Sequence, residues 1–233
     1  MQQEQRTIDR RKFLQSTVIT AMGAGTMSLF PFTAYANPYP DDDINIIRPV
    51  EGYSPQIGIL VSMMNWMRAT VLRAVKGLTQ PELDYLMDPQ ANTIGALLLH
   101  LAATDVVYQE KTFYGIKKGF SEVNKKWEIP MNLGEEARKQ IKGNKLEYYL
   151  SELQAVREKT LSEFKKRDDK WFAEIDPSFF GNLPTNNFCK WFHVCEHESN
   201  HNGQIKLIKA RLPGAKGGND YENISESIPL EFI

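Results

Sequence analysis

Residues 193–205 read HVCEHESNHNGQI and place three histidines, His193, His197 and His201, at intervals of four residues. The whole chain of 233 residues contains only four histidines, so three of them lie in this one stretch. On an α-helix, residues four apart differ by about 40° around the axis and about 6 Å along it. The three side chains therefore share one face of a helix. Two imidazoles at this spacing can hold a divalent metal ion, but the outer pair is about 12 Å apart, so three in a row cannot easily share one ion.

This stretch lies within a predicted helix that begins near Thr185 or Asn186 and ends at Leu212, before a Pro-Gly pair. Apolar residues at three- and four-residue spacing predict three more long helices, over residues 54–77, 92–114 and 146–168. We identify no alternating strand series and no hairpin signal, so no sheet is expected. Four long helices favour an all-α fold, specifically a four-helix bundle.

The segments between these helices are predicted to be mostly irregular. Residues 115–143 contain helix-breaking Pro130 and Gly134, and only residues 135–141 are expected to form a short helix. Residues 176–184 are predicted to form a loop. The bundle is assigned to residues 52–212, preceded by an extended lead-in over residues 37–51 and followed by a tail over residues 213–233.

Residues 1–36 have the features of an export signal. Arg10 and Arg11 precede an x-Phe-Leu motif, an apolar segment diluted by Gly and Thr follows, and residues 34–36 (AYA) form a small-x-small cleavage site. This pattern resembles a twin-arginine signal. The alternatives are an ordinary secretory signal or a retained membrane anchor, although the apolar run is shorter than the roughly 20 residues that span a bilayer. We therefore expect an exported, periplasmic protein that meets the membrane only transiently, during export.

Charge and cysteine content argue against nucleic-acid binding and against a disulfide framework. The net charge of −1 gives no basic surface, so nucleic-acid binding is not expected. The two cysteines, Cys189 and Cys195, are separated by about 9 Å of rise on one helix, which is too far for a disulfide.

The fourth histidine, His100, lies in the most apolar segment of the second predicted helix, residues 94–103 (IGALLLHLAA). A buried histidine needs partners for both ring nitrogens. Taken alone, His100 is interpreted as a core histidine bonded to a hydroxyl or a carbonyl. Beside a two-histidine face on another helix it completes a metal site, so we predict that His100, His197 and His201 bind one divalent ion. His193 then supports these ligands or lines a pocket, and the alternatives are a fourth ligand or a proton shuttle.

These residues resemble the DinB/YfiT-like superfamily. The resemblance covers roughly residues 52–212 and rests on the histidine of LLLHLA (residues 97–102) and the later His-Val-x-x-His-Glu-x-x-His-x-Gly-Gln-Ile motif. It implies a bundle with up-down-down-up connections, a divalent metal on His100, His197 and His201, and a homodimer. It also implies that Gly203 allows close helix packing and that Gln204 makes a polar contact near the site. Characterised members include transferases and isomerases that use low-molecular-weight thiols.

Three neutral imidazoles leave a coordination position open for water or substrate. Zinc is the default metal for such a site, with nickel, iron and manganese as alternatives. The sequence therefore predicts a metal-dependent enzyme acting on a small molecule, either a hydrolase or a thiol-dependent transferase. His193 or Glu198 is expected to assist proton transfer, and Glu198 to orient a histidine. The alternatives are a non-catalytic metal- or ligand-binding bundle and a plain helical protein whose histidines coincide by chance.

Overall fold

The structure, a computed structural model, describes residues 44–216. The predicted export signal, the first part of the lead-in and most of the tail lie outside these residues. In chain order the elements are α2 (Pro55–Val75), α3 (Gln80–Leu83), α4 (Ile94–Thr112), η2 (Glu122–Trp127), α5 (Glu128–Asn132), α6 (Gly134–Gln140), α7 (Leu146–Phe164), α8 (Asp169–Ala173), β1 (Ile175–Phe180), β2 (Leu183–Asn186) and α9 (Asn187–Lys209). Within this part of the chain, no helix is long and apolar enough to cross a membrane.

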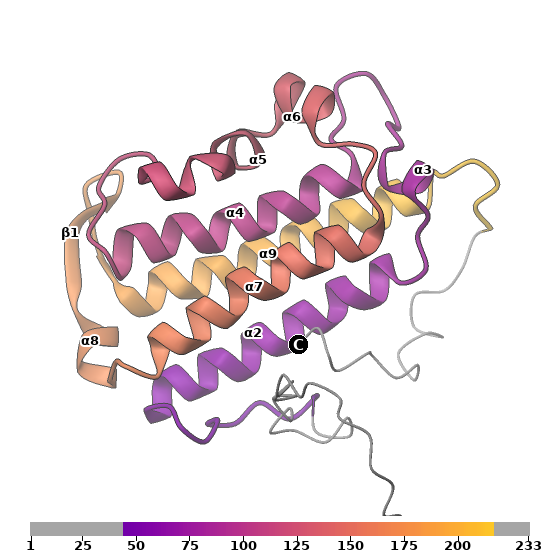
Figure 1. The fold of residues 1–233 in the computed structure, drawn as a ribbon. Helices are drawn as coiled ribbons and strands as arrows, with labels where there is room; N and C mark the ends of the chain where they lie inside the picture. Colours follow the sequence, from indigo (N-terminus) through magenta and orange to yellow (C-terminus); the bar gives the residue numbers. More distant parts are fainter. Residues whose placement is uncertain (1–43, 217–233) are drawn as a thin grey trace, which may run out of the picture. The chain divides into compact units, whose positions relative to one another are not determined.

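The structure is mostly helical, as predicted for an all-α fold. The four long helices α2, α4, α7 and α9 lie side by side, with α2 and α9 running in one direction and α4 and α7 in the other (Figure 1). Helix α4 packs against both α7 and α9, and α2 packs against α9. All four helices lie within the predicted ranges and end a few residues earlier than expected.

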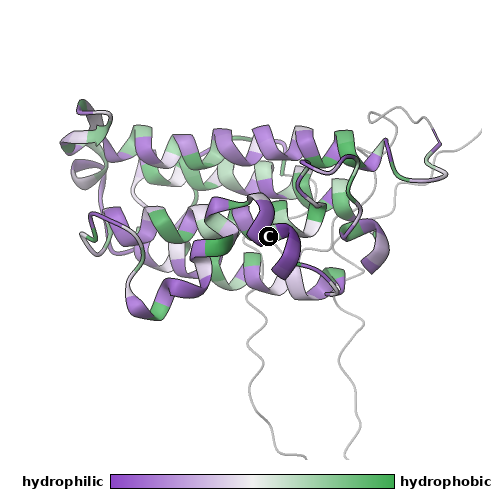
Figure 2. Ribbon diagram, turned by 90° about the horizontal axis from the view of Figure 1, so that it is seen from above, coloured by the Kyte–Doolittle hydropathy of each residue, from purple (hydrophilic) through white to green (hydrophobic). Residues whose placement is uncertain are grey.

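Side-chain caps fix the start of the two helices that carry the histidines. The Thr93 hydroxyl accepts a hydrogen bond from Ala96 N at 3.1 Å, and Asn186 Oδ1 accepts one from Cys189 N at 2.8 Å. Each cap satisfies a backbone N–H that the helix itself leaves unpaired. Figure 2 shows apolar and polar residues alternating along the long helices, the pattern expected of helices with one buried face.

The apolar core is dense enough that one glycine is required for helix contact. A Cβ added at Gly95 would lie 2.6 Å from the hydroxyl of Tyr149, which is closer than real Cβ contacts. Glycine at this position therefore lets α4 approach α7. The largest fully buried side chains include Trp191, Tyr149, Phe164 and Phe172.

The prediction of a loop over residues 176–184 is wrong, because this segment forms an antiparallel hairpin. Strands β1 and β2 pair with Ile175 opposite Asn186 and Phe180 opposite Leu183, which leaves a two-residue turn. Gly181 and Asn182 in that turn both have positive φ, at 60° and 66°. Turns of this kind need positive φ at both central residues, which Gly and Asn tolerate best.

The prediction for residues 115–143 is correct only in part. Helix α6 matches the short helix expected at residues 135–141, but η2 and α5 also form in the segment expected to be irregular. These elements span five to seven residues each, too few to display a helical period in the sequence. Both η2 and α5 pack against α4, which brings them over the helix that carries His100 (Figure 1).

Candidate metal centre

The structure brings His100, His197 and His201 together between α4 and α9, as the sequence predicted. One nitrogen from each ring lies within 4.8 Å of the other two. The Nε2 atom of His197 is 3.3 Å from that of His100 and 3.2 Å from that of His201. The three rings therefore direct the same kind of atom at one point.

The outer ring nitrogens of His100 and His201 are held by oxygen atoms. His100 Nδ1 lies 3.0 Å from the carbonyl oxygen of Pro130, and His201 Nδ1 lies 2.9 Å from Gln204 Oε1. Both oxygens can only accept, so each Nδ1 must carry the proton. In a neutral imidazole the other nitrogen is then unprotonated. His100 and His201 therefore present lone pairs on Nε2 to the centre of the cluster.

Burial keeps these histidines neutral. It lowers the pKa of His100 from 6.5 to about 4 and the pKa of His197 to about 3, the latter with help from the neighbouring His201 and His100. Burial also lowers the pKa of His201. Neutral imidazole is the form that binds a metal ion, so the cluster is ready for one at neutral pH.

Two of the three nitrogen separations fit a tetrahedral ion. Zinc–nitrogen bonds of about 2.0–2.1 Å at a tetrahedral angle place two ligand nitrogens about 3.3 Å apart. The 3.2 and 3.3 Å separations within the cluster match this value. His197 Nδ1 is buried and has no hydrogen-bond partner among residues 44–216. The nitrogen lone pairs that point at one another repel unless a proton or a cation lies between them. A cation would stabilise this arrangement, so these three residues could hold a metal ion.

His193 lies one helical turn from the cluster and does not share its centre. Its ring centroid is 5.6 Å from that of His197 and 5.4 Å from that of Phe180 in the hairpin. Its Nδ1 atom is 2.7 Å from the hydroxyl of Tyr108 on α4. His193 is therefore held beside the cluster by a tyrosine and a phenylalanine.

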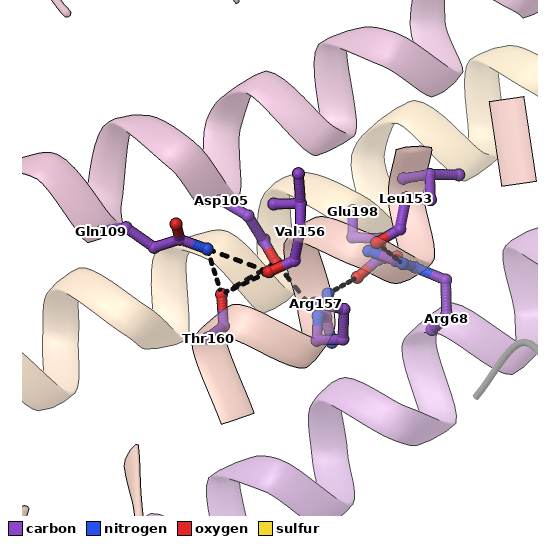
Figure 3. A network of polar contacts seen from close by, with 8 residues as sticks. All are labelled: Arg68, Asp105, Gln109, Leu153, Val156, Arg157, Thr160 and Glu198. Carbon is purple, nitrogen blue, oxygen red and sulfur yellow. Dashed lines mark hydrogen bonds and ion pairs between the residues drawn. The ribbon is translucent and has the colours of Figure 1, made fainter. Parts of the chain in front are cut away.

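Glu198 belongs to a buried network that joins the four long helices (Figure 3). Its carboxylate accepts from Arg68 Nε on α2 and, at 2.9 Å, from Arg157 Nη2 on α7. Arg157 Nε also donates to Asp105 Oδ2 on α4 at 3.0 Å. Burial alone would raise the pKa of Glu198, but Arg68 and Arg157 outweigh it and hold that pKa below its usual value. Within residues 44–216, Glu198 makes no hydrogen bond to a histidine.

The chain matches the sequence profile of the family described as mycothiol-S-transferase over residues 59–214, about two thirds of its length. It belongs to the mycothiol-S-transferase family. This family is part of the DinB-like superfamily, whose members bind metal ions, so the resemblance seen in the sequence is confirmed at that level. No curated protein matches the chain.

Several groups contact the four histidines within the matched region, and the family resemblance indicated only some of them. The polar contact expected of Gln204 is confirmed by its hydrogen bond to His201. The close packing expected at Gly203 is wrong, because a Cβ added there would meet nothing within 4 Å. Tyr108 and the carbonyl of Pro130 were missed. Tyr108 lies two turns after His100 on the same helix, a spacing that could have indicated it, whereas no sequence signal marks a backbone carbonyl.

Proposed function

We propose that this protein is a divalent-metal-dependent thiol S-transferase. The observation that carries the proposal is the convergence of three neutral histidine nitrogens in a chain of the mycothiol-S-transferase family. We assign His100, His197 and His201 as the ligands and a low-molecular-weight thiol of the mycothiol class as the cosubstrate. Zinc is the preferred metal, with nickel, iron and manganese as alternatives.

The reaction that we propose joins the thiol to an electrophilic carbon of a small-molecule acceptor. A divalent ion held by the three histidines would act as a Lewis acid that lowers the pKa of a coordinated thiol. The S–H bond breaks and its proton passes to solvent, a sulfur–carbon bond forms, and the leaving group departs with its bonding pair. The protein contributes fixed ligands, because Pro130 and Gln204 orient the rings of His100 and His201.

The proposal extends to the connections of the fold, the location of the protein and its partners. We assign the four long helices to a four-helix bundle with up-down-down-up connections, which the directions and contacts of α2, α4, α7 and α9 support. The Arg10–Arg11 motif supports export to the periplasm by the twin-arginine route. The family resemblance supports a homodimer, and the net charge of −1 supports the absence of a nucleic-acid partner.

The predicted export signal favours a second candidate function. Low-molecular-weight thiols are mainly cytosolic cosubstrates, so an exported protein with the same ligands would act as a hydrolase with coordinated water as the nucleophile. Ionisation of water on a three-histidine site is an established use of such ligands. A third candidate, binding without turnover, would leave both reactions at their background rates.

The test is the rate of S-conjugate formation by protein loaded with zinc or nickel. Mycothiol, and cysteine as a smaller thiol, would be mixed with a bimane electrophile and the fluorescent conjugate followed. We expect wild type and Ser199→Ala, an exposed position on the same helix, to accelerate the reaction, and His100→Ala and His197→Ala to lose that acceleration. Background rates with both thiols and both metals, in wild type that holds the metal, would overturn the transferase proposal.

A further inference from the structure

Tyr108 and His193 share a hydrogen bond in which the donor can be inferred. The Tyr108 side chain is only 6% exposed, and its hydroxyl lies 2.7 Å from His193 Nδ1. Among residues 44–216, that nitrogen is the only hydrogen-bond partner of the hydroxyl, and His193 Nε2 has none. The pair is separate from the hydrogen bonds that orient His100 and His201.

The tyrosine must be the donor in this bond. Burial raises the pKa of Tyr108 above its usual value of 10, so the phenol keeps its proton at neutral pH. If His193 Nδ1 donated instead, the phenol proton would be left buried without an acceptor, which is a costly arrangement. Donation by Tyr108 leaves both groups satisfied and makes Nδ1 the acceptor.

The hairpin holds this pair in place. The Phe179 ring centroid lies 5.6 Å from that of Tyr108, and the Phe180 centroid lies 5.4 Å from that of His193. These contacts restrict rotation of the two rings that share the hydrogen bond. The hairpin, which the sequence did not predict, therefore has a definite position beside the metal centre.

We propose that Tyr108 fixes His193 as an Nε2–H hydrogen-bond donor for an anionic atom of a ligand bound at the three-histidine cluster. With Nδ1 occupied as an acceptor, the proton of the neutral ring lies on Nε2. His193 is then neither a fourth metal ligand nor a base, because neither nitrogen offers a lone pair. This inference rests on the proposed function, in which the thiolate sulfur is the anionic atom, and it makes Tyr108 a positioning residue.

The first test determines which ring nitrogen of His193 carries the proton. It uses wild-type protein, so the result does not depend on whether a variant folds. Long-range proton–nitrogen NMR spectra of ¹⁵N-histidine-labelled protein separate protonated from unprotonated ring nitrogens. We expect His193 to show an unprotonated Nδ1 and a protonated Nε2, both before and after zinc is added. A proton on Nδ1, or a His193 nitrogen that acquires the shift of a metal ligand, would overturn the proposal.

The second test measures the hydrogen bond to an anion. Cobalt-loaded protein would be titrated with azide, and binding followed by the visible absorption of the metal. We expect roughly tenfold weaker azide binding in His193→Phe, from the loss of one hydrogen bond to a charged group, and a smaller loss in Tyr108→Phe. Ser199→Ala is the matched control and should bind azide as wild type does.

The outcomes separate this inference from the proposed function. Cobalt bound with unchanged azide affinity in His193→Phe would overturn the role of His193 and leave the metal site intact. A protein that binds neither cobalt nor zinc would overturn the metal site and, with it, the anion-binding role. The NMR spectra would then still show which ring nitrogen of His193 carries the proton, and a proton on Nδ1 would overturn the inference on that ground as well.

Discussion

His197 and Glu198 are neighbours on α9, yet they belong to two polar regions of opposite design. His197 faces α4, where three neutral histidines converge with too few protons between their inner nitrogens. Glu198 faces the interior, where two arginines and two carboxylates bring a balanced set of charges to one network (Figure 3). One step of about 100° around the helix separates the two.

The difference indicates which polar region stabilises the fold and which could hold a metal ion. In the interior network, each of Arg68, Asp105, Arg157 and Glu198 meets an opposite charge, and the four come from four different helices. Such a network sets how the helices sit against one another. The histidine cluster leaves its inner lone pairs without a cation of its own. A partner from outside the chain would therefore complete it.

Breaking the interior network should have the largest effect on stability. Glu198→Ala leaves Arg68 buried without its carboxylate, and we expect the free energy of unfolding to fall by about 3–5 kcal/mol. Urea denaturation would measure the loss. Glu196→Ala, an exposed neighbour on α9, is the control and should stay within about 0.5 kcal/mol of wild type. A loss below about 1 kcal/mol for Glu198→Ala would show that water reaches the arginines.

Acid should weaken metal binding far less than ordinary histidines would allow. Three histidines with pKa values near 6.5 would lose about 10⁴-fold in zinc affinity at pH 5. Burial lowers the pKa of His100 to about 4 and of His197 to about 3, so both stay unprotonated at pH 5. We expect a loss below about a hundredfold between pH 7 and pH 5, measured by competition with a chromophoric chelator. A loss near 10⁴-fold would mean that the rings are solvated.

The same pKa values have an opposite consequence for the metal-free fold. The free energy of unfolding of the metal-free protein does not vary with pH through these histidines above their unfolded pKa of about 6.5. It falls as the pH drops from 6.5 toward 4, because in that range the histidines take up protons only in the unfolded chain. Urea denaturation of metal-free protein between pH 7 and pH 4 would show this decline. His100→Ala should show a shallower one, since it removes one of the depressed groups.

Removing the support of one metal-binding candidate should weaken the site without destroying it. Gln204→Ala deletes the acceptor of the His201 Nδ1 proton, and we expect roughly 10–100-fold weaker zinc binding. Gln204→Glu, which keeps an acceptor, should restore most of the affinity. Unchanged zinc affinity in Gln204→Ala would show that His201 needs no help to hold its orientation.

The smallest effect is expected at the surface of α9 beside the cluster. A Cβ at Gly203 meets nothing within 4 Å, so Gly203→Ala should stabilise the protein by about 0.5–1 kcal/mol through helix propensity. The matched change Gly95→Ala should destabilise, because its Cβ would lie 2.6 Å from the Tyr149 hydroxyl. Thermal unfolding would compare the two, and a destabilised Gly203→Ala would point to a contact at this surface.

Periodic features made the long helices and the three histidines predictable. His197 and His201 share a face because they are four residues apart, and His100 stood out as a polar residue in an apolar helix. Ion pairs between residues far apart in the sequence leave no such periodic pattern. Arg68 and Glu198 are 130 residues apart, and nothing in either local pattern indicates the other. The predicted role of Glu198 therefore relied on its neighbour His197 and on the family resemblance, and Arg68 did not enter it.

The missed hairpin shows a different limit, because its signal was present. Gly181–Asn182 is a recognised two-residue hairpin turn, with Phe179 and Phe180 directly before it and Leu183 directly after it. Pro177 and Pro184 lie one in each strand, but proline is tolerated at an edge, and a two-stranded sheet consists of edges. Correct weighting of the turn would also have placed Phe179 and Phe180 at the end of a strand that pairs with the segment leading into α9.

The most direct test of the account is the metal content of the folded protein. Wild type, His100→Ala and His197→Ala would be incubated with zinc or nickel, freed of excess by gel filtration, and analysed by elemental mass spectrometry. We expect about one ion per chain in wild type and a clear loss in both variants, which lie on different helices. No ion in wild type with either metal, or full occupancy in both variants, would contradict a metal centre shared by α4 and α9.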